Sequence, residues 1–319
     1  MQDAAVAYIG KLPTHDDFVR QRASTPTMRA LDDWVRTGLH RARQDRPEWE
    51  AVYDAAPLRR FVLWGEGPRV PNGLVGVLRP SRDANRRPYP LVVAREIPGR
   101  ALPPTHAAYL PVQAQPFLSA AAQLVRRAAT GAVSRDALRR RAEALPDVPL
   151  RSTMPRTHRH YLQEETIDTF RAAVFETDDE DAELKHLRGL LKAIRTPPDA
   201  AATGSGAAVR LPVRSDETAV HDLGFWMGLL LRLRTPETPP SLFWAPPAPG
   251  SDDEPALLYP SPPSPVALFD VLAPERAGAR VRRPAAERPP AEADPPLPAG
   301  GPDLFRRDHL RLHTVLRRL

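Results

Sequence analysis

Residues 58–93 read LRRFVLWGEGPRVPNGLVGVLRPSRDANRRPYPLVV, and this stretch decides the fold class. Three short runs rich in β-branched and aromatic residues, Leu58–Trp64, Leu74–Leu78 and Tyr89–Val93, are separated by segments rich in Gly, Pro and Asn. The connections between these runs leave no room for a crossover helix, so neighbouring strands should pair antiparallel. The stretch therefore predicts the antiparallel centre of a sheet.

Helical spacing appears on both sides of this centre. Upstream, residues 6–13 indicate a short strand, and Ser24-Thr25-Pro26 begins a helix whose apolar residues recur at helical spacing from Leu31 to Ala42. The same patterns predict further helices over residues 49–53, 116–130, 134–145, 161–175, 179–194, 216–231 and 265–272, and short strands over residues 207–213, 241–244 and 256–259. We therefore expect an α/β (α+β) fold over residues 1–273, with a mixed, mostly antiparallel sheet covered by helices.

The C-terminal tail has a different composition. Residues 274–302 consist largely of Pro, Ala, Arg and Glu with almost no large apolar residues, which predicts a disordered Pro-rich linker. Residues 303–319 then predict a basic amphipathic helix, with Arg residues around an apolar stripe. The stripe consists of Phe305, Leu312, Leu316 and Leu319. It would dock in the groove of a partner protein or fold back on the body, and an incidental solvated extension is a third interpretation.

The charge of the chain is concentrated in this tail. The whole sequence of 319 residues has a formal net charge of +6 and a pI near 10. Residues 274–319 carry 10 Arg against 6 Asp and Glu, an excess of four, which leaves an excess of only two for residues 1–273. A nearly neutral body does not indicate nucleic-acid binding, and we expect no nucleic-acid partner. Binding of the tail to nucleic acid or a membrane surface remains a hypothesis, which salt-insensitive binding would contradict.

Several function classes lack their sequence signatures. The chain has no Cys, so disulfides, thiol nucleophiles and Cys-type zinc sites are excluded. The nine His residues show no metal-ligand spacing on a helix face, and His158 and His160 should point apart on a helix. No apolar run is long enough for a membrane span and no signal peptide is evident, so we expect a cytoplasmic protein without metal or cofactor.

Charged residues gather in two predicted turns, each of which follows a strand. The turns contain Lys11, His15, Asp16, Asp17, Asp83 and Arg87. In one interpretation, Asp16, Asp17 and Asp83 serve a metal- or phosphate-dependent hydrolase. That hypothesis needs the carboxylates to converge within about 4 Å of one site, with Lys11 or Arg87 assisting. In the structural interpretation, which we favour, Asp83 and Arg87 clamp their loop, and the aspartate pair precedes a helix and stabilises its positive N-terminal end.

The same two turns resemble a known family. Residues 10–18, Gly-Lys-Leu-Pro-Thr-His-Asp-Asp-Phe, resemble the Gly-Lys-Leu-Pro-x-x-Gly-Asp-Phe opening of TagF (ImpM), an accessory protein of bacterial type VI secretion systems. The similarity continues in Asp33-Trp34, in Pro57-x-x-x-Phe61, in Gly76-Val77-Leu78-x-Pro80-Ser81-x-Asp83 and in Arg87-x-Tyr89-Pro90-Leu91. The specific part covers residues 8–96, and a weaker match covers residues 219–273.

The resemblance implies a cytoplasmic, non-enzymatic protein that represses type VI secretion after translation through protein–protein binding. It implies partners within the secretion machine, with a forkhead-associated scaffold protein as one such partner, and it allows peripheral association with the membrane complex. The binding surface that it implies consists of Gly10, Lys11, Leu12, Pro13, Asp17, Phe18, Trp34, Pro80, Ser81, Asp83, Arg87 and Pro90.

Two positions depart from the family pattern. Asp16 stands where the family has the Gly of Gly-Asp-Phe, and Arg86 stands where it has the Gly before Arg87. A positive φ at either position would strain the turn, and Asp tolerates that conformation better than Arg.

Overall fold

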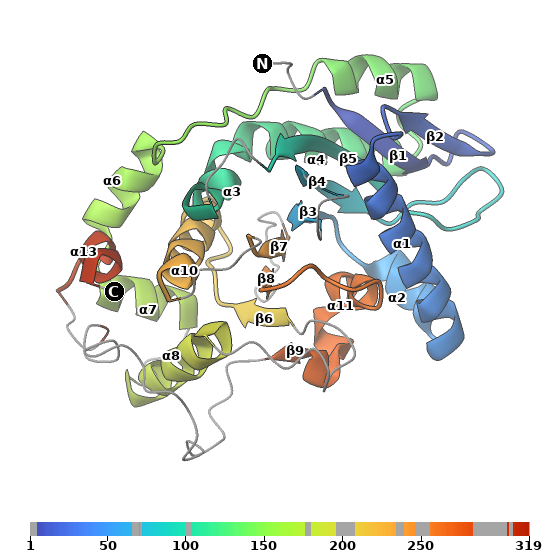
Figure 1. Ribbon diagram of the computed structural model, residues 1–319. Helices are drawn as coiled ribbons and strands as arrows, with labels where there is room; N and C mark the ends of the chain where they lie inside the picture. The colour runs from blue at the N-terminus through green and yellow to red at the C-terminus, as the bar shows by residue number, and fades with distance from the viewer. Residues whose placement is uncertain are drawn as a thin grey trace.

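A single mixed sheet crosses the molecule in the computed structural model, which describes residues 5–65, 70, 72–99, 104–175, 180–195, 208–233, 239–245, 256–282, 305 and 309–318 (Figure 1). In this part of the chain the strand order is β2-β1-β5-β4-β3-β7-β8-β6-β9. The strands are β1 (Ala7–Lys11), β2 (Phe18–Gln21), β3 (Arg59–Trp64), β4 (Asn72–Arg79), β5 (Leu91–Pro98), β6 (Ala208–Leu211), β7 (Ser241–Trp244), β8 (Ala256–Tyr259) and β9 (Val281–Arg282). Only the β6–β9 pair is parallel among these strands. The expected mixed, mostly antiparallel α+β fold is confirmed.

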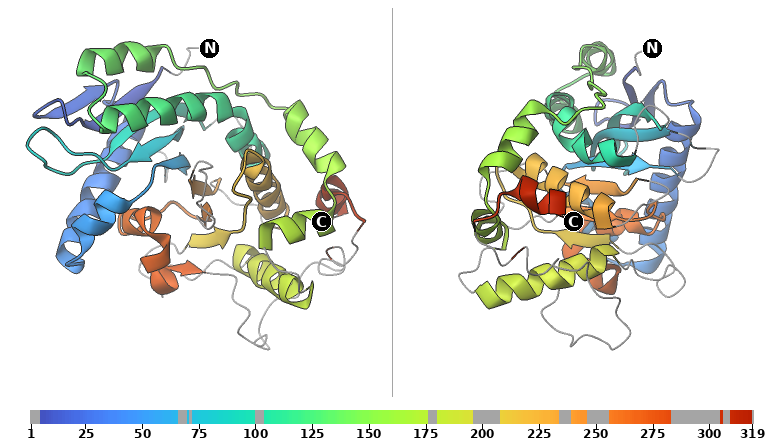
Figure 2. Two further views of the ribbon diagram at one scale, coloured as in Figure 1. Left: turned by 180° about the vertical axis from the view of Figure 1, so that it is seen from behind. Right: turned by 60° about the vertical axis from the view of Figure 1, so that its left-hand side comes forward.

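Helices cover both faces of the sheet, as two views from different sides show (Figure 2). The helices are α1 (Pro26–Asp45), α2 (Trp49–Ala55), α3 (Leu110–Gln113), α4 (Gln115–Ala129), α5 (Arg135–Glu143), α6 (Arg156–Glu164), α7 (Ile167–Phe175), α8 (Glu180–Arg195), α10 (Ala219–Leu233), α11 (Ala267–Leu272) and α13 (Leu312–Arg318), with 3₁₀ turns η1 (Pro104–Tyr109), η2 (Pro274–Arg276) and η3 (Gly278–Arg280). One core lies between the sheet, α1 and α11, and a larger core lies between the opposite face, α4, α10 and their neighbours.

The stretch that predicted the centre of the sheet forms strands β3, β4 and β5. Arg59 pairs with Leu78 and Trp64 with Gly73, and β4 pairs along its length with β5. Alternate side chains enter different cores: Val62 and Val75 face α4, whereas Phe61 and Leu74 face α1. A strand whose two faces are both buried reads as a continuous apolar run, which is the pattern of these residues.

Helix α1 begins as its sequence predicts. The Thr25 hydroxyl accepts a hydrogen bond from the Met28 N–H at 3.2 Å, and Pro26 occupies the first helical position. Its apolar stripe packs on the sheet and α11, with the Trp34 ring 5.8 Å from the Phe243 ring. This packing fixes α1 across one face of the sheet.

The structure corrects the predicted helix over residues 161–175. Helix α6 ends at Glu164 and α7 begins at Ile167, because the extended link between them pairs with the C-terminal segment. Thr166 forms a β-bridge with Arg311, and the Leu312 N–H donates to the Glu165 carbonyl at 3.0 Å. A segment distant in sequence thus interrupts a pattern that looked continuous.

The tail also departs from expectation. Residues 274–282 are not a disordered linker: they form η2, η3 and β9, which pairs with β6. Residues 283–304, 306–308 and Leu319 lie outside the described residues. Of the helix predicted over residues 303–319, the described residues form a helix over Leu312–Arg318, whereas residues 305 and 309–311 are not helical. Three residues of the predicted apolar stripe, Phe305 and the helix residues Leu312 and Leu316, are buried in the larger core of the protein itself.

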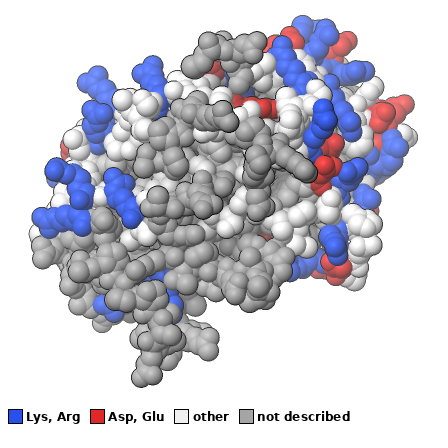
Figure 3. Space-filling model, in the orientation of Figure 1, with Lys and Arg blue, Asp and Glu red and all other residues white. Residues whose placement is uncertain are grey.

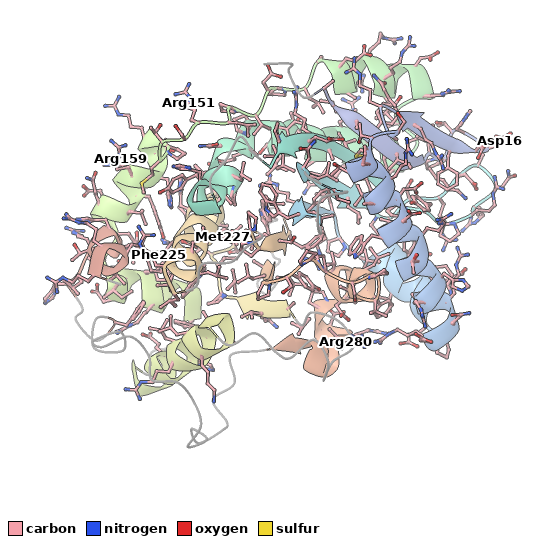
Figure 4. All side chains as sticks on the ribbon, in the orientation of Figure 1. Asp16, Arg151, Arg159, Phe225, Met227 and Arg280 are labelled. Carbon is pink, nitrogen blue, oxygen red and sulfur yellow. The ribbon has the colours of Figure 1, made fainter. Side chains whose placement is uncertain are left out.

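The basic face of the tail helix remains on the surface. Exposed arginines of α6, α13 and the segments before them lie at the left edge of the molecule in Figure 3, with little acidic surface between them. Figure 4 labels two of them, Arg151 and Arg159. The exposed arginines of these segments include Arg151, Arg156, Arg159, Arg311, Arg317 and Arg318. Because the apolar stripe of the tail is buried in the larger core, the tail docks on the body of the protein, which is one of the expected interpretations.

Candidate functional site

The two turns that carry the sequence motifs meet at one end of the sheet. Lys11 ends β1, and Ser81 follows β4 after Pro80. The Ser81 hydroxyl donates to the Lys11 carbonyl at 2.8 Å across 70 residues of sequence. The Ala84 N–H donates to the His15 carbonyl at 3.0 Å. These contacts place both turns on one continuous surface.

A buried carboxylate joins the turns. Asp83 lies 2.9 Å from the Lys11 Nζ and 2.7 Å from the Arg87 Nε, and its side chain is 0% exposed. Its other oxygen accepts from the Arg87 backbone N–H at 2.8 Å. Burial raises the pKa of Asp83, but hydrogen bonds from Lys11 and Arg87 outweigh that effect and lower the pKa to about 2. We call Lys11, Asp83 and Arg87 the ion-pair clamp.

Local backbone geometry supports the clamp. Gly10 has a φ of +151°, and a Cβ there would lie 2.4 Å from the Pro90 carbonyl oxygen, so only Gly fits. The Tyr53 hydroxyl donates to the Ser81 carbonyl at 2.8 Å and accepts from the Ser81 N–H at 2.9 Å. Burial raises the pKa of Tyr53, so its phenol stays neutral and keeps both roles.

An exposed rim surrounds the clamp. Asp16 and Asp17 are exposed, and Figure 4 shows Asp16 at the periphery of the molecule. Asp17 accepts from the Phe18 N–H at 2.7 Å, and Arg87 donates to the Asp16 carbonyl. The Phe18 ring is half-buried, with its centroid 4.8 Å from the Tyr89 ring and 5.1 Å from the Lys11 Nζ. The rim therefore presents acidic, basic and aromatic groups together.

The structure separates the predicted site residues into two groups. Those at the joined turns are Gly10, Lys11, Leu12, Pro13, Asp17, Phe18, Pro80, Ser81, Asp83, Arg87 and Pro90. Trp34 is elsewhere: it lies on the buried face of α1, and its indole N–H donates to the Ser264 carbonyl at 2.9 Å. Trp34 is therefore a core residue, and its indole ring packs against the ring of Phe243.

The carboxylates do not form the cluster that the hydrolase hypothesis needs. Lys11 and Arg87 together bond both carboxylate oxygens of Asp83, and the Asp17 carboxylate accepts a hydrogen bond from the backbone N–H of Phe18. Within the described ranges, no three His, Asp or Glu side chains are placed to hold a metal ion. The ion pairs hold the two turns together, and both oxygens of the central carboxylate, Asp83, are already bonded.

The two departures from the family pattern have different outcomes. Arg86 has a φ of +61°, so the position that is Gly in the family does require the left-handed conformation here. Asp16 is not among the described non-glycine residues with positive φ. The expected strain is therefore present at Arg86 and absent at Asp16.

Sequence reasoning missed a second polar site, between α6 and α10. Asp222 is 0% exposed, accepts from the Tyr161 hydroxyl at 2.6 Å and pairs with Arg214 at 3.1 Å. Beside it, the Nδ1 atoms of His158 and His221 lie 3.3 Å apart. We call these five residues the buried polar network.

The histidines of the network are neutral. Burial and the neighbouring His221 lower the pKa of His158 to about 3, and burial also lowers the pKa of His221. The spacing of His158 and Tyr161 on one helix face was the available signal, but their partners lie on α10 and were not predictable by spacing. His160 is exposed, which confirms that it points away from His158.

The helices of the described chain include none that is both long and apolar enough to cross a membrane.

Among the comparisons with known proteins, the match to a family model supports the motif assignment. Residues 7–145 match the family model of the TagF N-terminal domain, described as type VI secretion system-associated. No curated protein matches the chain. Among solved structures, PA0076 from Pseudomonas aeruginosa aligns with 16% identity and a TM-score of 0.46, covering 92% of this chain and 100% of that one.

Proposed function

Because residues 7–145 are a TagF N-terminal domain, which is associated with type VI secretion systems, we propose that the protein is a non-enzymatic regulator of such a system. It acts in the cytoplasm through protein–protein binding and represses assembly of the secretion machine after translation. A component of that machine, such as a forkhead-associated scaffold protein, is the proposed partner.

The ion-pair clamp is the observation that carries this proposal. It joins two motif turns into one surface, and its buried Asp83 is fully satisfied by two cations. A preformed surface binds with less loss of conformational entropy than a flexible one. The exposed rim of Asp16, Asp17, Phe18 and Arg87 then offers the groups that a partner would contact.

Affinity purification from the native bacterium tests the binding step. We expect the wild-type protein to recover a secretion component and the charge reversal Asp16→Lys to recover less of it. Asp16 contributes only its backbone carbonyl to the clamp, so this variant should keep its fold. The matched control is Asp45→Lys, at an exposed position near the end of α1. Equal recovery with Asp16→Lys and the wild type would contradict the proposed surface.

A deletion strain tests the regulatory step. If the protein represses assembly, loss of the gene should increase secretion and sheath assembly under repressing conditions. Complementation with the wild-type gene should reverse the increase. Unchanged secretion in the deletion strain, under both repressing and inducing conditions, would count against a regulatory role.

A further inference from the structure

Three arginines lie at the face of the sheet that α4 covers. Arg60 lies on β3 and Arg79 at the end of β4, on the same sheet face as Val62 and Val77. Arg126 lies on α4, which packs along β4, and its charge acts on both Arg60 and Arg79. We call Arg60, Arg79 and Arg126 the arginine cluster.

Among the residues that the structure describes, no acidic side chain offsets the charge of Arg60 or Arg79. Within the described residues, Arg126 is the only charged group that acts on Arg60 and on Arg79. Burial and then the charge of Arg126 lower the pKa of Arg60 to about 10, and the same two causes lower the pKa of Arg79. Arg60 is only 7% exposed, so its charge lies in a poorly solvated place. Buried charges are normally paired, and within the described part of the chain this one has no anionic partner.

Unused hydrogen-bond donors lie at the same place. The buried Nε of Arg60 has no partner, and neither has the indole Nε1 of Trp244. Trp244 is 1% exposed and is the cross-strand partner of Arg60, so the two side chains lie side by side on one face. The Ser119 hydroxyl accepts from Arg60 at 3.2 Å, which leaves its own O–H available to donate. Buried donors without acceptors are rare in native proteins.

We propose that the arginine cluster, with Ser119 and the Trp244 indole, forms a binding site for a phosphoryl group, either free phosphate or a phosphate monoester. Guanidinium groups match phosphate oxygens in a bidentate manner. A dianionic phosphoryl group compensates three cations better than a carboxylate does. Its tetrahedral oxygens also accept from several directions, and here the donors come from the sheet below and from α4 above.

Thermal unfolding of the full-length protein in a titration of inorganic phosphate, at constant ionic strength, tests the site. We expect a saturable rise in Tm for the wild type. Arg126→Gln should weaken phosphate binding about tenfold or more, because a charge-assisted hydrogen bond is lost. The matched control is Arg127→Gln, which removes the exposed neighbouring charge on α4 and should bind as the wild type does.

Two further variants separate binding from folding. Arg126→Gln without phosphate should be at least as stable as the wild type, because it removes repulsion between like charges. Trp244→Phe keeps an aromatic ring but removes the indole donor, and should weaken binding about threefold to tenfold. O-phosphoserine in place of phosphate distinguishes the ligand sources: tighter binding indicates a monoester, and weaker binding indicates free phosphate. A wild-type Tm that responds to phosphate no more than to chloride, or an Arg126→Gln variant that retains the response, would overturn the proposal.

This proposal is independent of the regulatory role, because the purified protein alone is tested.

Discussion

The ion-pair clamp and the buried polar network each surround a carboxylate whose side chain is 0% exposed, Asp83 in one and Asp222 in the other. Asp83 faces two cations from neighbouring turns, whereas Asp222 faces one cation and a tyrosine, with two stacked neutral histidines beside them. The clamp is therefore stable over a wide pH range, while the network depends on histidines staying uncharged. The same problem, a buried charge, has two solutions with different dependence on protons.

We expect the largest difference in stability between the clamp and the network when the pH is lowered. His158 has a folded pKa of about 3, below the ordinary value, so the unfolded chain binds its proton first. Its contribution to stability is present above about pH 6.5 and is lost as the pH falls toward 3. The loss amounts to about 4 kcal/mol by linkage. Urea denaturation at a series of pH values measures it. His158→Asn should flatten the dependence in this window, and an unchanged slope would contradict the assignment.

Shortening the buried side chain of Phe305 tests how much the tail stabilises the larger core, which lies on the same side of the sheet as the buried polar network. Phe305 is 0% exposed, and its carbonyl accepts from Arg171. Phe305→Ala should lower the free energy of unfolding by about 3–4 kcal/mol, because it leaves a cavity in the larger core. Arg318→Ala, at an exposed position, is the control and should change it by less than about 0.5 kcal/mol. Near-equal stability of the two variants would show that the tail is not part of the core.

Removing one cation of the clamp tests how much stability depends on pairing Asp83 with both Lys11 and Arg87. Lys11→Met leaves Asp83 buried with only Arg87, and should cost about 3 kcal/mol in denaturant unfolding. In the wild type, the depressed pKa of Asp83 gives stability that is present above about pH 4 and lost toward pH 2. In the variant that loss should begin at higher pH. Arg36→Ala breaks an exposed pair with Asp33 and serves as the control, costing at most about 0.5 kcal/mol.

The smallest effect should come from the strained turn beside the clamp. Arg86→Gly relieves a φ of +61° and restores the residue that the family pattern has there. We expect a gain of about 0.5–1 kcal/mol, since relief of the left-handed strain exceeds the entropy cost of Gly in the unfolded chain. The rise in Tm measures it. The carbonyl of this residue, which accepts from Arg82, is unaffected by the change. A destabilised variant would mean that the Arg86 side chain makes a favourable contribution of its own.

Local patterns predicted much of the fold. Thr25-Pro26 predicted the start of α1, and the spacing of residues 58–93 predicted three antiparallel strands. These features depend on neighbours within a turn or a hairpin. Strand β2 was missed because it is short and follows a polar turn, and β9 was missed because its pairing with β6 crosses some 70 residues of sequence.

The candidate site was predicted in part. The motif residues of both turns were identified from the sequence, and the Asp83–Arg87 pair was expected as a loop clamp. The third member, Lys11, and the burial of the carboxylate came only from the structure. The buried polar network and the arginine cluster were not predicted at all, because each combines residues from strands or helices that the sequence does not show to be neighbours.

By itself, the sequence determined the periodicities, the helix caps, the turn residues and the family motifs, since each depends on residues close together in the chain. Only the tertiary structure decided which charges are paired, which histidines are buried and where the tail lies. The physical reason is that burial and electrostatic pairing depend on distance in space. Phe305 and Leu312 show this directly. The same apolar stripe fits a partner's groove or the protein's own core, and here α6, α7 and α10 contribute to the surface that buries it.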